Sequence, residues 1–506
     1  MSREAAQTSC DPLPFSPARK RFRLPLLRAA WSESMNTKRS TELINSSIIL
    51  AVGTFLPKLA SFVILPILTA YLTKEEYGSY DLIVVLASLI LPAATLQIQT
   101  AAFRFLIMAR EKEEEKKRII TNIFLVMVPV SVVMLAVVYF LFPSQSVTLK
   151  VIVCIYFFAD AIYGAMGQIA RGLARNVDYS VGAIINSIGN VLFLLILVMK
   201  LSAGLKGAVF TLFAAYTLAS FFIGYRIRIH RYFDLSARDP QMIKKMLAYS
   251  WPMVPNAMSM WVMRASDRFV ISIYMGVTAN AVYAVANKVP SILTLAQNTF
   301  SLAWQENASV SVNDDNVGEY YSDMFRNIFD IMAGFMSFLI GGAPIIFSIL
   351  IRGDYSEALN QIPVLLMAML FFGLSSFMGG VYIAFLQTRS VGITTMVAAA
   401  INLIVDISTI RWIGLYAASG STLVSYIALF LYRVVNVRNY ITLAYDVKHM
   451  IFTFAVLAVQ IYLYYMHSLP VTIVNMTFGA VFFILLNKRN LALILRKLAS
   501  KIKKKK

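Results

Sequence analysis

Long apolar stretches alternate with short polar ones along most of the chain. A helix needs about 20 mostly apolar residues to cross a bilayer. Fourteen stretches meet this requirement, and we expect a membrane-spanning helix at each: residues 44–70, 81–106, 119–142, 147–169, 177–199, 207–225, 247–275, 280–304, 323–350, 361–386, 391–412, 415–435, 446–467 and 470–487. They are too long for barrel strands and lack an alternating pattern. The pattern therefore predicts an all-α integral membrane protein with about 14 transmembrane helices.

The composition supports the same class. The 506 residues are 58% hydrophobic and only 14% charged, whereas soluble domains are about 45–50% apolar and roughly 25% charged. This excludes a soluble enzyme, and the 13% aromatic content excludes a disordered chain. Two cysteines and three scattered histidines provide neither a disulfide framework nor a metal site.

Lysine and arginine are distributed unevenly between the loops. With the N-terminus placed inside, 36 of the 46 lie in cytoplasmic segments and six lie outside. The positive-inside rule therefore predicts that both termini are cytoplasmic. The net charge of +20 then reflects contact with anionic lipid rather than with nucleic acid. One predicted cytoplasmic loop, 305–322, departs from the rule, because it contains four acids and neither Lys nor Arg.

Prolines within the spans suggest an internal repeat. Pro57 and Pro66 interrupt the first span, and Pro252 and Pro255 interrupt the seventh. Broken helices are frequent in transporters built from two repeats. We expect two six-helix lobes around a central cavity, followed by two extra helices. The predicted segments are a disordered or misassigned cytoplasmic extension (1–40), the lobes (41–240 and 241–440), the extra transmembrane helices (441–490) and a basic cytoplasmic tail (491–506).

Ionisable residues inside the predicted spans mark a candidate site. An ionised side chain at this depth costs about 3 kcal/mol, so it should face a cavity or a partner. Five cations lie in the first two spans of the two lobes: Lys58, Arg104, Arg264, Arg268 and Lys288. We expect Asp267, the one acid that we assign to these four spans, to neutralise Arg264 three residues away. The alternative is that the cations pair across helices with Asp160, Asp330 or Asp406.

A cavity lined by these cations would suit an anionic guest, because Arg and Lys both bind phosphate. We take six residues as candidate substrate-binding groups: Lys58, Arg104, Arg264, Asp267, Arg268 and Lys288. Asp160 and Asp406 are candidates for coupling to a proton or a sodium ion, unless they form satisfied interhelical pairs. Polar residues such as Asn186 and Asn190 could hydrogen-bond sugars or join helices.

Motifs of several enzyme classes are missing. The sequence has no phosphate-binding G-x-x-x-x-G-K-[ST] loop, no H-E-x-x-H zinc motif and no G-x-S-x-G elbow. The predicted outside loops are all short, which leaves no room there for a catalytic domain. We therefore expect a carrier rather than an enzyme, with no cofactor apart from a coupling ion.

Three stretches carry a family resemblance. They are Tyr71–Tyr80 after the first span, Pro252–Asn256 followed by Ser266–Phe269 in the seventh, and Tyr283–Pro290 followed by Ala303–Gln305 in the eighth. In their order and spacing they resemble the polysaccharide flippases (Wzx type) of the multidrug/oligosaccharidyl-lipid/polysaccharide exporter superfamily. The resemblance covers about residues 41–487.

The resemblance implies a multi-pass protein of the bacterial plasma membrane that works by alternating access. Its cargo would be undecaprenyl-diphosphate-linked oligosaccharide, moved from the inner to the outer leaflet for capsule, O-antigen or exopolysaccharide synthesis. Its partners would be that lipid, membrane lipids, a polysaccharide polymerase and other export machinery, and not nucleic acid. Fourteen spans also occur in lipid II flippases, so a lipid II or multidrug exporter stays an alternative. A membrane-embedded polymerase is a further, less favoured one.

Overall fold

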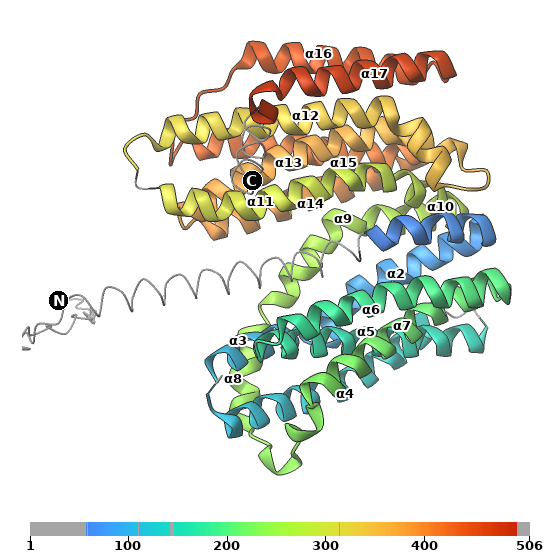
Figure 1. Ribbon diagram of the computed structural model, residues 1–506, viewed down its shortest axis with the longest axis vertical. Helices are drawn as coiled ribbons and strands as arrows, with labels where there is room; N and C mark the ends of the chain where they lie inside the picture. The colour runs from blue at the N-terminus through green and yellow to red at the C-terminus, as the bar shows by residue number, and fades with distance from the viewer. Residues whose placement is uncertain (1–56, 58, 110, 142–145, 313, 493–506) are drawn as a thin grey trace, which may run out of the picture.

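The computed structural model describes residues 57, 59–109, 111–141, 146–312 and 314–492 (Figure 1). These residues form helices and connecting turns, and no strand occurs among them. After the helix Leu59–Tyr71, the amino-terminal half contains α2 (Lys74–Ala94), α3 (Ile98–Met108), α4 (Glu113–Leu141), α5 (Val147–Gly172), α6 (Asn176–Leu194), α7 (Gly204–Ile227) and α8 (Pro240–Ser250). The carboxyl-terminal half contains α9 (Met253–Met275), α10 (Val277–Ala286), α11 (Lys288–Ser311), α12 (Val317–Leu350), α13 (Ile362–Ala384), α14 (Thr388–Ile413), α15 (Leu415–Val437), α16 (Val447–Tyr464) and α17 (Leu469–Leu486).

The helices correspond to the predicted spans. Eleven of those described are long and apolar enough to cross a membrane. The other three predicted spans correspond to the helix Leu59–Tyr71, to α9, and to α10 together with α11. The prediction of an all-α membrane protein is therefore confirmed. The expected extension 1–40 and most of the tail 491–506 lie outside the described residues.

Two predicted spans are each divided into two helices. The span 81–106 breaks after α2, where Leu96 and Gln97 adopt positive φ angles of 50° and 54°, a conformation that ends a right-handed helix. The span 280–304 breaks between α10 and α11, just before Pro290. Proline fits the first turn of a helix because it has no N–H to donate there. The prediction of a single continuous helix was wrong in both places.

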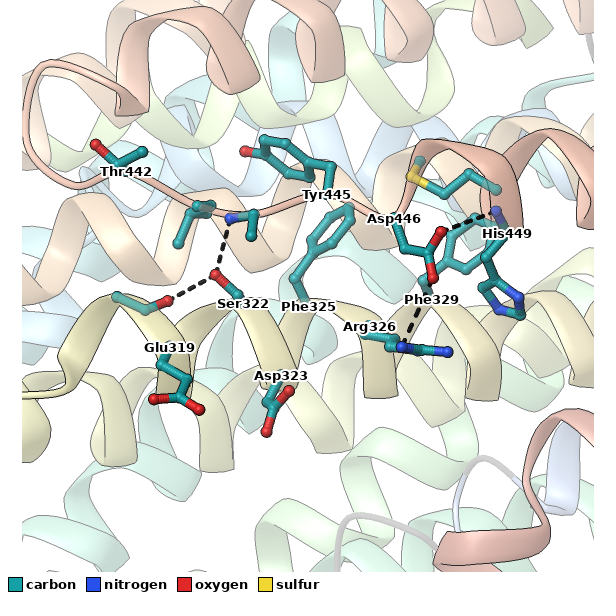
Figure 2. Close-up of a pocket in the computed structure, with 14 residues that line it drawn as sticks. Glu319, Ser322, Asp323, Phe325, Arg326, Phe329, Thr442, Tyr445, Asp446 and His449 are labelled. Atoms are coloured by element: carbon teal, nitrogen blue, oxygen red, sulfur yellow. Dashed lines mark hydrogen bonds and ion pairs between the residues drawn. The ribbon is translucent and has the colours of Figure 1, made fainter.

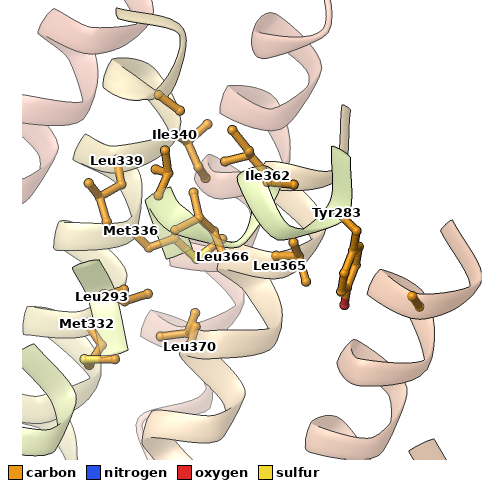
Figure 3. Packing of buried hydrophobic residues seen from close by; sticks show 14 of the residues in the cluster. Tyr283, Leu293, Met332, Met336, Leu339, Ile340, Ile362, Leu365, Leu366 and Leu370 are labelled. Atoms are coloured by element: carbon orange, nitrogen blue, oxygen red, sulfur yellow. The ribbon is translucent and has the colours of Figure 1, made fainter. Parts of the chain in front are cut away.

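Two helix bundles divide the structure (Figure 1). In the first, α5 packs against α7, α3 and α4, and α6 packs against α7. In the second, α13 packs against α11, α12 and α15, and α14 packs against α15. Figure 3 shows the core of the second bundle, where α12 and α13 contribute Met336, Ile340, Leu366 and Leu370. This core continues into the amino-terminal half, where Leu68, Tyr77 and Leu194 belong to the same cluster of buried residues.

The bundles meet through α2, α9 and α10. Helix α2 packs against α10 and α9, while α9 also packs against α14. The contact between α2 and α10 is close, since a Cβ placed on Gly78 would lie 1.9 Å from the carbonyl oxygen of Val277. Lys74 pairs with Asp354 at 3.2 Å near the same end. This end of the molecule is the predicted outer one.

Helices α16 and α17 lie along α12 on the side that faces away from the first bundle (Figure 1). Glycines allow the close approach of α17. A Cβ on Gly341 would lie 2.5 Å from the carbonyl oxygen of Asn475, and one on Gly479 would lie 2.5 Å from that of Ser337. Helix α16 is bonded to the same part of α12, because the Ser337 hydroxyl donates to the side-chain oxygen of Gln460 at 2.6 Å. The two extra helices are thus attached firmly to the second bundle.

Candidate functional site

An ion pair between the bundles dominates the predicted cationic site. Arg268 of α9 places Nη1 at 2.9 and 3.0 Å from the two carboxylate oxygens of Asp81 on α2. Asn280 of α10 also donates to Asp81, at 3.4 Å, and to the carbonyl of Gly78 at 3.1 Å. Sequence reasoning overlooked Asp81 because it begins a predicted span and was not counted as an acid at depth. The expectation of one acid among these helices was therefore wrong.

Asp267 does not neutralise Arg264 as expected. Its Oδ2 accepts from the Tyr283 hydroxyl at 2.8 Å and from Thr422 Oγ1 at 2.9 Å. With its amide nitrogen turned toward the carboxylate, Asn402 donates to Oδ1 at 3.0 Å. Arg264 is exposed, makes no ion pair with the described residues, and places its guanidinium 6.0 Å from the Phe372 ring.

Lys288 lies close to the pair that joins the bundles. It begins α11, is half-buried, and lies within electrostatic range of Asp81 and Arg268. No carboxylate of the described part of the chain forms a salt bridge with it. Asp267 also lies within electrostatic range of Arg268, so Arg268 and Lys288 are balanced by the two carboxylates Asp81 and Asp267. Arg264 lies one turn before Arg268 on α9 and gives the junction its positive balance.

The remaining predicted cations lie elsewhere. Arg104 is exposed on α3, which packs against α5, α4 and α8 of the first bundle. Lys58 lies outside the described residues. The structure thus brings Arg268 and Lys288 together, places Arg264 near them on the same helix, and does not bring Arg104 into contact with them.

Asp406 forms a second buried group with Asp267. Its side chain on α14 is fully buried, and neither carboxylate oxygen has a hydrogen-bond partner among the described residues. It lies within electrostatic range of Asp267 and one helical turn beyond Asn402. We call Asp267 and Asp406 the carboxylate pair. Two neighbouring buried carboxylates repel each other when both are ionised. Either one of them therefore takes up a proton, or a cation binds between them.

The carboxylate pair is set among neutral oxygen donors. Thr422 of α15 and Tyr283 of α10 already contact Asp267, and Asn402 connects the helices. No cluster of three or more His, Cys, Asp or Glu side chains occurs within the described ranges. Carboxylate, hydroxyl and amide oxygens suit a proton or a hard monovalent cation better than a transition metal.

Asp160 lies in the other bundle, on α5, beside several tyrosines. It forms no salt bridge or side-chain hydrogen bond within the part of the chain that the structure describes. It is therefore not one of the satisfied interhelical pairs considered from the sequence. Asp330 does form an interhelical pair, but with His449 of α16, whose Nε2 lies 2.6 Å from its Oδ1, and not with one of the predicted cations.

Sequence reasoning also missed a buried arginine. Arg433 of α15 is 4% exposed, and it was counted as a loop residue at the end of a predicted span. Its guanidinium donates to the carbonyl of Ser375 at 2.7 Å and to the hydroxyls of Thr394 and Thr395 at 3.0 and 3.1 Å. These contacts satisfy the guanidinium and tie α13, α14 and α15 together, so its role is structural.

A separate cavity of about 610 Å³ lies between the start of α12 and residues 442–450. Figure 2 shows Glu319, Asp323 and Arg326 along its α12 side, with Tyr445 and His449 opposite. Arg326 lies 3.6 Å from Asp446. None of the predicted site residues lines this cavity.

Solved structures of low sequence identity share this architecture. The fold is similar to that of lipid II flippase MurJ in an inward closed conformation, with a TM-score of 0.69 and 14% identity over 89% of this chain and 100% of that one. It is also similar to an inward-facing multidrug resistance MATE family transporter of the MOP superfamily, with a TM-score of 0.64 and 15% identity over 78% and 98%. A MOP superfamily transporter from Pyrococcus furiosus matches with a TM-score of 0.53 and 15% identity over 78% and 95%. No curated protein matches the chain in sequence.

Two helix bundles joined at one end thus define a multi-pass membrane protein with the fold of MOP-superfamily transporters. The family of polysaccharide biosynthesis proteins matches residues 43–304, slightly more than half of the chain. The chain belongs to this polysaccharide biosynthesis family.

Proposed function

We propose that the protein is a flippase that moves polyprenyl-diphosphate-linked oligosaccharide from the inner to the outer leaflet of the bacterial plasma membrane. The observation that carries the proposal is the cationic junction between the bundles, where Arg264, Arg268 and Lys288 outnumber Asp81 and Asp267. Membership of the polysaccharide biosynthesis family and the transporter fold support it. A diphosphate is the part of such a lipid that positive charge would recognise.

The cations divide into two roles. Arg264 and Lys288 make no ion pair with described residues, so both are available to the diphosphate. Arg268 is held by Asp81 in this conformation, and it becomes available when the bundles separate at that end. Lys58 and Arg104 stay candidate contacts for other stages of the passage.

Alternating access follows from where the bundles touch. The contacts between them include Asp81 with Arg268, Lys74 with Asp354, and the Arg352 backbone N–H donating to Thr69 Oγ1 at 3.0 Å. All lie toward the predicted outer end. In this arrangement cargo would enter from the inner side, and these contacts would break when the site opens outward.

The carboxylate pair supplies a means of coupling. A proton or sodium ion at Asp267 and Asp406 would relieve their mutual repulsion. Because α9 carries both Asp267 and Arg268, occupation of the pair by an ion and release of the Asp81 ion pair act on the same helix. The ion gradient would thus bias the carrier between its two states.

The second candidate function is flipping of lipid II, which the fold similarity to MurJ favours. Both cargoes carry a diphosphate, so the cationic junction suits either. A drug exporter for cationic guests is less compatible with that junction. A polymerase would need catalytic groups beyond those that the site provides.

Transport in liposomes tests the proposal. Purified protein is reconstituted with a fluorescent undecaprenyl-diphosphate-linked oligosaccharide, and a membrane-impermeant glycosidase is added outside. The flippase should expose the inner-leaflet pool to the enzyme, and Lys288→Gln should abolish this exposure. Protein-free liposomes are the control, and lipid II in parallel vesicles separates the two cargoes. Equal protection with and without the protein for both lipids would contradict the proposal.

A further inference from the structure

Asp160 lies at the middle of α5 against a wall of tyrosine rings. Tyr156 and Tyr163 lie one turn before and after it on the same face of α5. Tyr216 of α7 contacts both, with ring centroids 6.1 Å from Tyr156 in a stacked arrangement and 5.0 Å from Tyr163. Tyr80 of α2 packs against the same cluster. We call these four rings and Asp160 the tyrosine box.

The described residues leave open space one turn from Asp160 on α5. Gly164 lies one turn further along α5, and a Cβ placed there would meet no atom within 4 Å. Asp160 and Tyr163 are half-buried rather than sealed in the core. A half-buried carboxylate with no ion pair beside open space is poised to accept hydrogen bonds from a guest.

Unpartnered amides lie at the same depth. The Tyr179 ring of α6 lies next to Gly167 of α5, 3.2 Å from a Cβ position there, which sets the register between these antiparallel helices. Asp160 lies seven residues before Gly167 on α5. On the antiparallel α6 the corresponding position lies seven residues after Tyr179, at Asn186, and Asn190 lies one turn beyond it. The Oδ1 atoms of both asparagines are buried without a hydrogen-bond partner in the described part of the chain.

We propose that the tyrosine box is a glycan subsite that binds a neutral or amide-bearing sugar ring of the cargo. The aliphatic face of a pyranose packs on the half-buried rings of Tyr80, Tyr163 and Tyr216, which cover the buried Tyr156. The hydroxyl and N-acetyl N–H groups of the sugar donate to Asp160. An aromatic lining combined with a few polar groups is typical of ligand pockets. The negative charge of Asp160 disfavours uronic acids and phosphate at this position. The proposal rests on the proposed flippase function.

The subsite is placed correctly for a sugar attached to a diphosphate. Tyr80 and Asp81 are neighbours on α2, and one packs against the tyrosine box while the other binds Arg268. The box is therefore separated from the cationic junction by the width of a single helix. The first sugars of a lipid-linked oligosaccharide follow directly on its diphosphate, so both groups can be held together.

Binding of two defined lipids tests the subsite. The full chain in nanodiscs is titrated with undecaprenyl diphosphate and with the same lipid carrying one N-acetylglucosamine. The sugar-bearing lipid should bind about tenfold more tightly, and Asp160→Asn should remove most of this difference. Tyr216→Phe should retain the difference because the ring stays, whereas Tyr216→Leu should reduce it. Tyr225→Leu is the matched control on the same helix, since Tyr225 is 74% exposed.

The outcomes separate the two proposals. Lys288→Gln should weaken binding of both lipids, because it removes a diphosphate contact. Equal affinity of the two lipids for the wild-type chain would overturn the glycan subsite and leave the flippase proposal intact. If Asp160→Asn changes the response to sodium or pH but not the sugar preference, Asp160 belongs to an ion site and the subsite is overturned. Failure of the wild-type chain to bind either lipid would overturn the flippase proposal itself.

Discussion

Arg268 of α9 and Asp81 of α2 form an ion pair across the two helix bundles, with Nη1 2.9 Å from Oδ1. Their side chains are 19% and 8% exposed, so water screens the pair only weakly. Such a pair persists only while the bundles are close at this end. The ion pair therefore stabilises one of the two states that alternating access requires.

Asp81→Asn should destabilise the folded protein. The substitution leaves the Arg268 guanidinium without a counter-charge in a shielded site, which costs about 3 kcal/mol. The double variant Asp81→Asn with Arg268→Gln should recover part of this loss, because no charge is left unpaired. Thermal unfolding of Asp81→Asn, Arg268→Gln and the double variant in one detergent measures the coupling. Strictly additive effects of the two substitutions would contradict an ion pair.

Arg264→Gln should lower transport without lowering stability. Arg264 is exposed and makes no ion pair with described residues, so its loss removes only the long contact with the Phe372 ring. A charged hydrogen bond to phosphate contributes about 1.5–3 kcal/mol, which corresponds to roughly ten- to a hundredfold in binding. Lys206→Gln is the control, since Lys206 is another exposed cation at the start of α7. A similar loss in both variants would show that overall charge, rather than the site, matters.

The membrane-spanning stretches could be predicted because hydropathy over about 20 residues decides membrane insertion. The break after α2 could not, since nothing in the local sequence requires the positive φ angles of Leu96 and Gln97. The break in the eighth span was missed as well, although Pro290 lies in the first turn of α11, because a proline within a span does not show where packing ends one helix and begins the next.

The site was predictable only in part. Charges within apolar stretches identified Arg268 and Lys288, because charge at depth is costly and needs a purpose. Their partners were not predictable, since helical spacing shows neighbours within one helix only. Asp267 therefore looked like the partner of Arg264, whereas its contacts come from Tyr283 and Thr422 on other helices.

The contact between Asp354 and Lys74 should make the stability of the folded protein depend on pH only at acidic pH. The hydrogen bond from Lys74, with a further one from Ser356, holds the pKa of Asp354 below its ordinary value. A lowered folded-state pKa gives stabilisation that is complete above the unfolded pKa, about 3.9, and lost as the pH falls through the folded value. The difference in melting temperature between wild type and Asp354→Asn should be constant from pH 6 to 8. A difference that disappears already at about pH 6 would contradict this contact.

Gly341→Val should detach α17 from α12. A Cβ at residue 341 would lie 2.5 Å from the Asn475 carbonyl oxygen and from the Met476 Cα, so α17 must move away. We expect reduced stability of the kind caused by overpacking, about 1–3 kcal/mol or more. Gly420→Ala is the control, because a Cβ there meets no atom within 4 Å. Comparable melting temperatures for Gly341→Val and wild type would show that the helices do not pack so closely.

Asp406→Asn should uncouple transport from an ion gradient. The carboxylate is fully buried and makes no hydrogen bond among described residues, so an isosteric amide removes its charge with little loss of packing. Asp267, relieved of a neighbouring charge, then no longer needs a proton or sodium ion to stay buried. We expect gradient-driven flipping in liposomes to fall to the rate seen without a gradient, while facilitated exchange persists. Asp323→Asn is the control, because Asp323 is exposed near the separate cavity. A sodium or proton gradient that still accelerates the Asp406→Asn variant would place the coupling ion elsewhere.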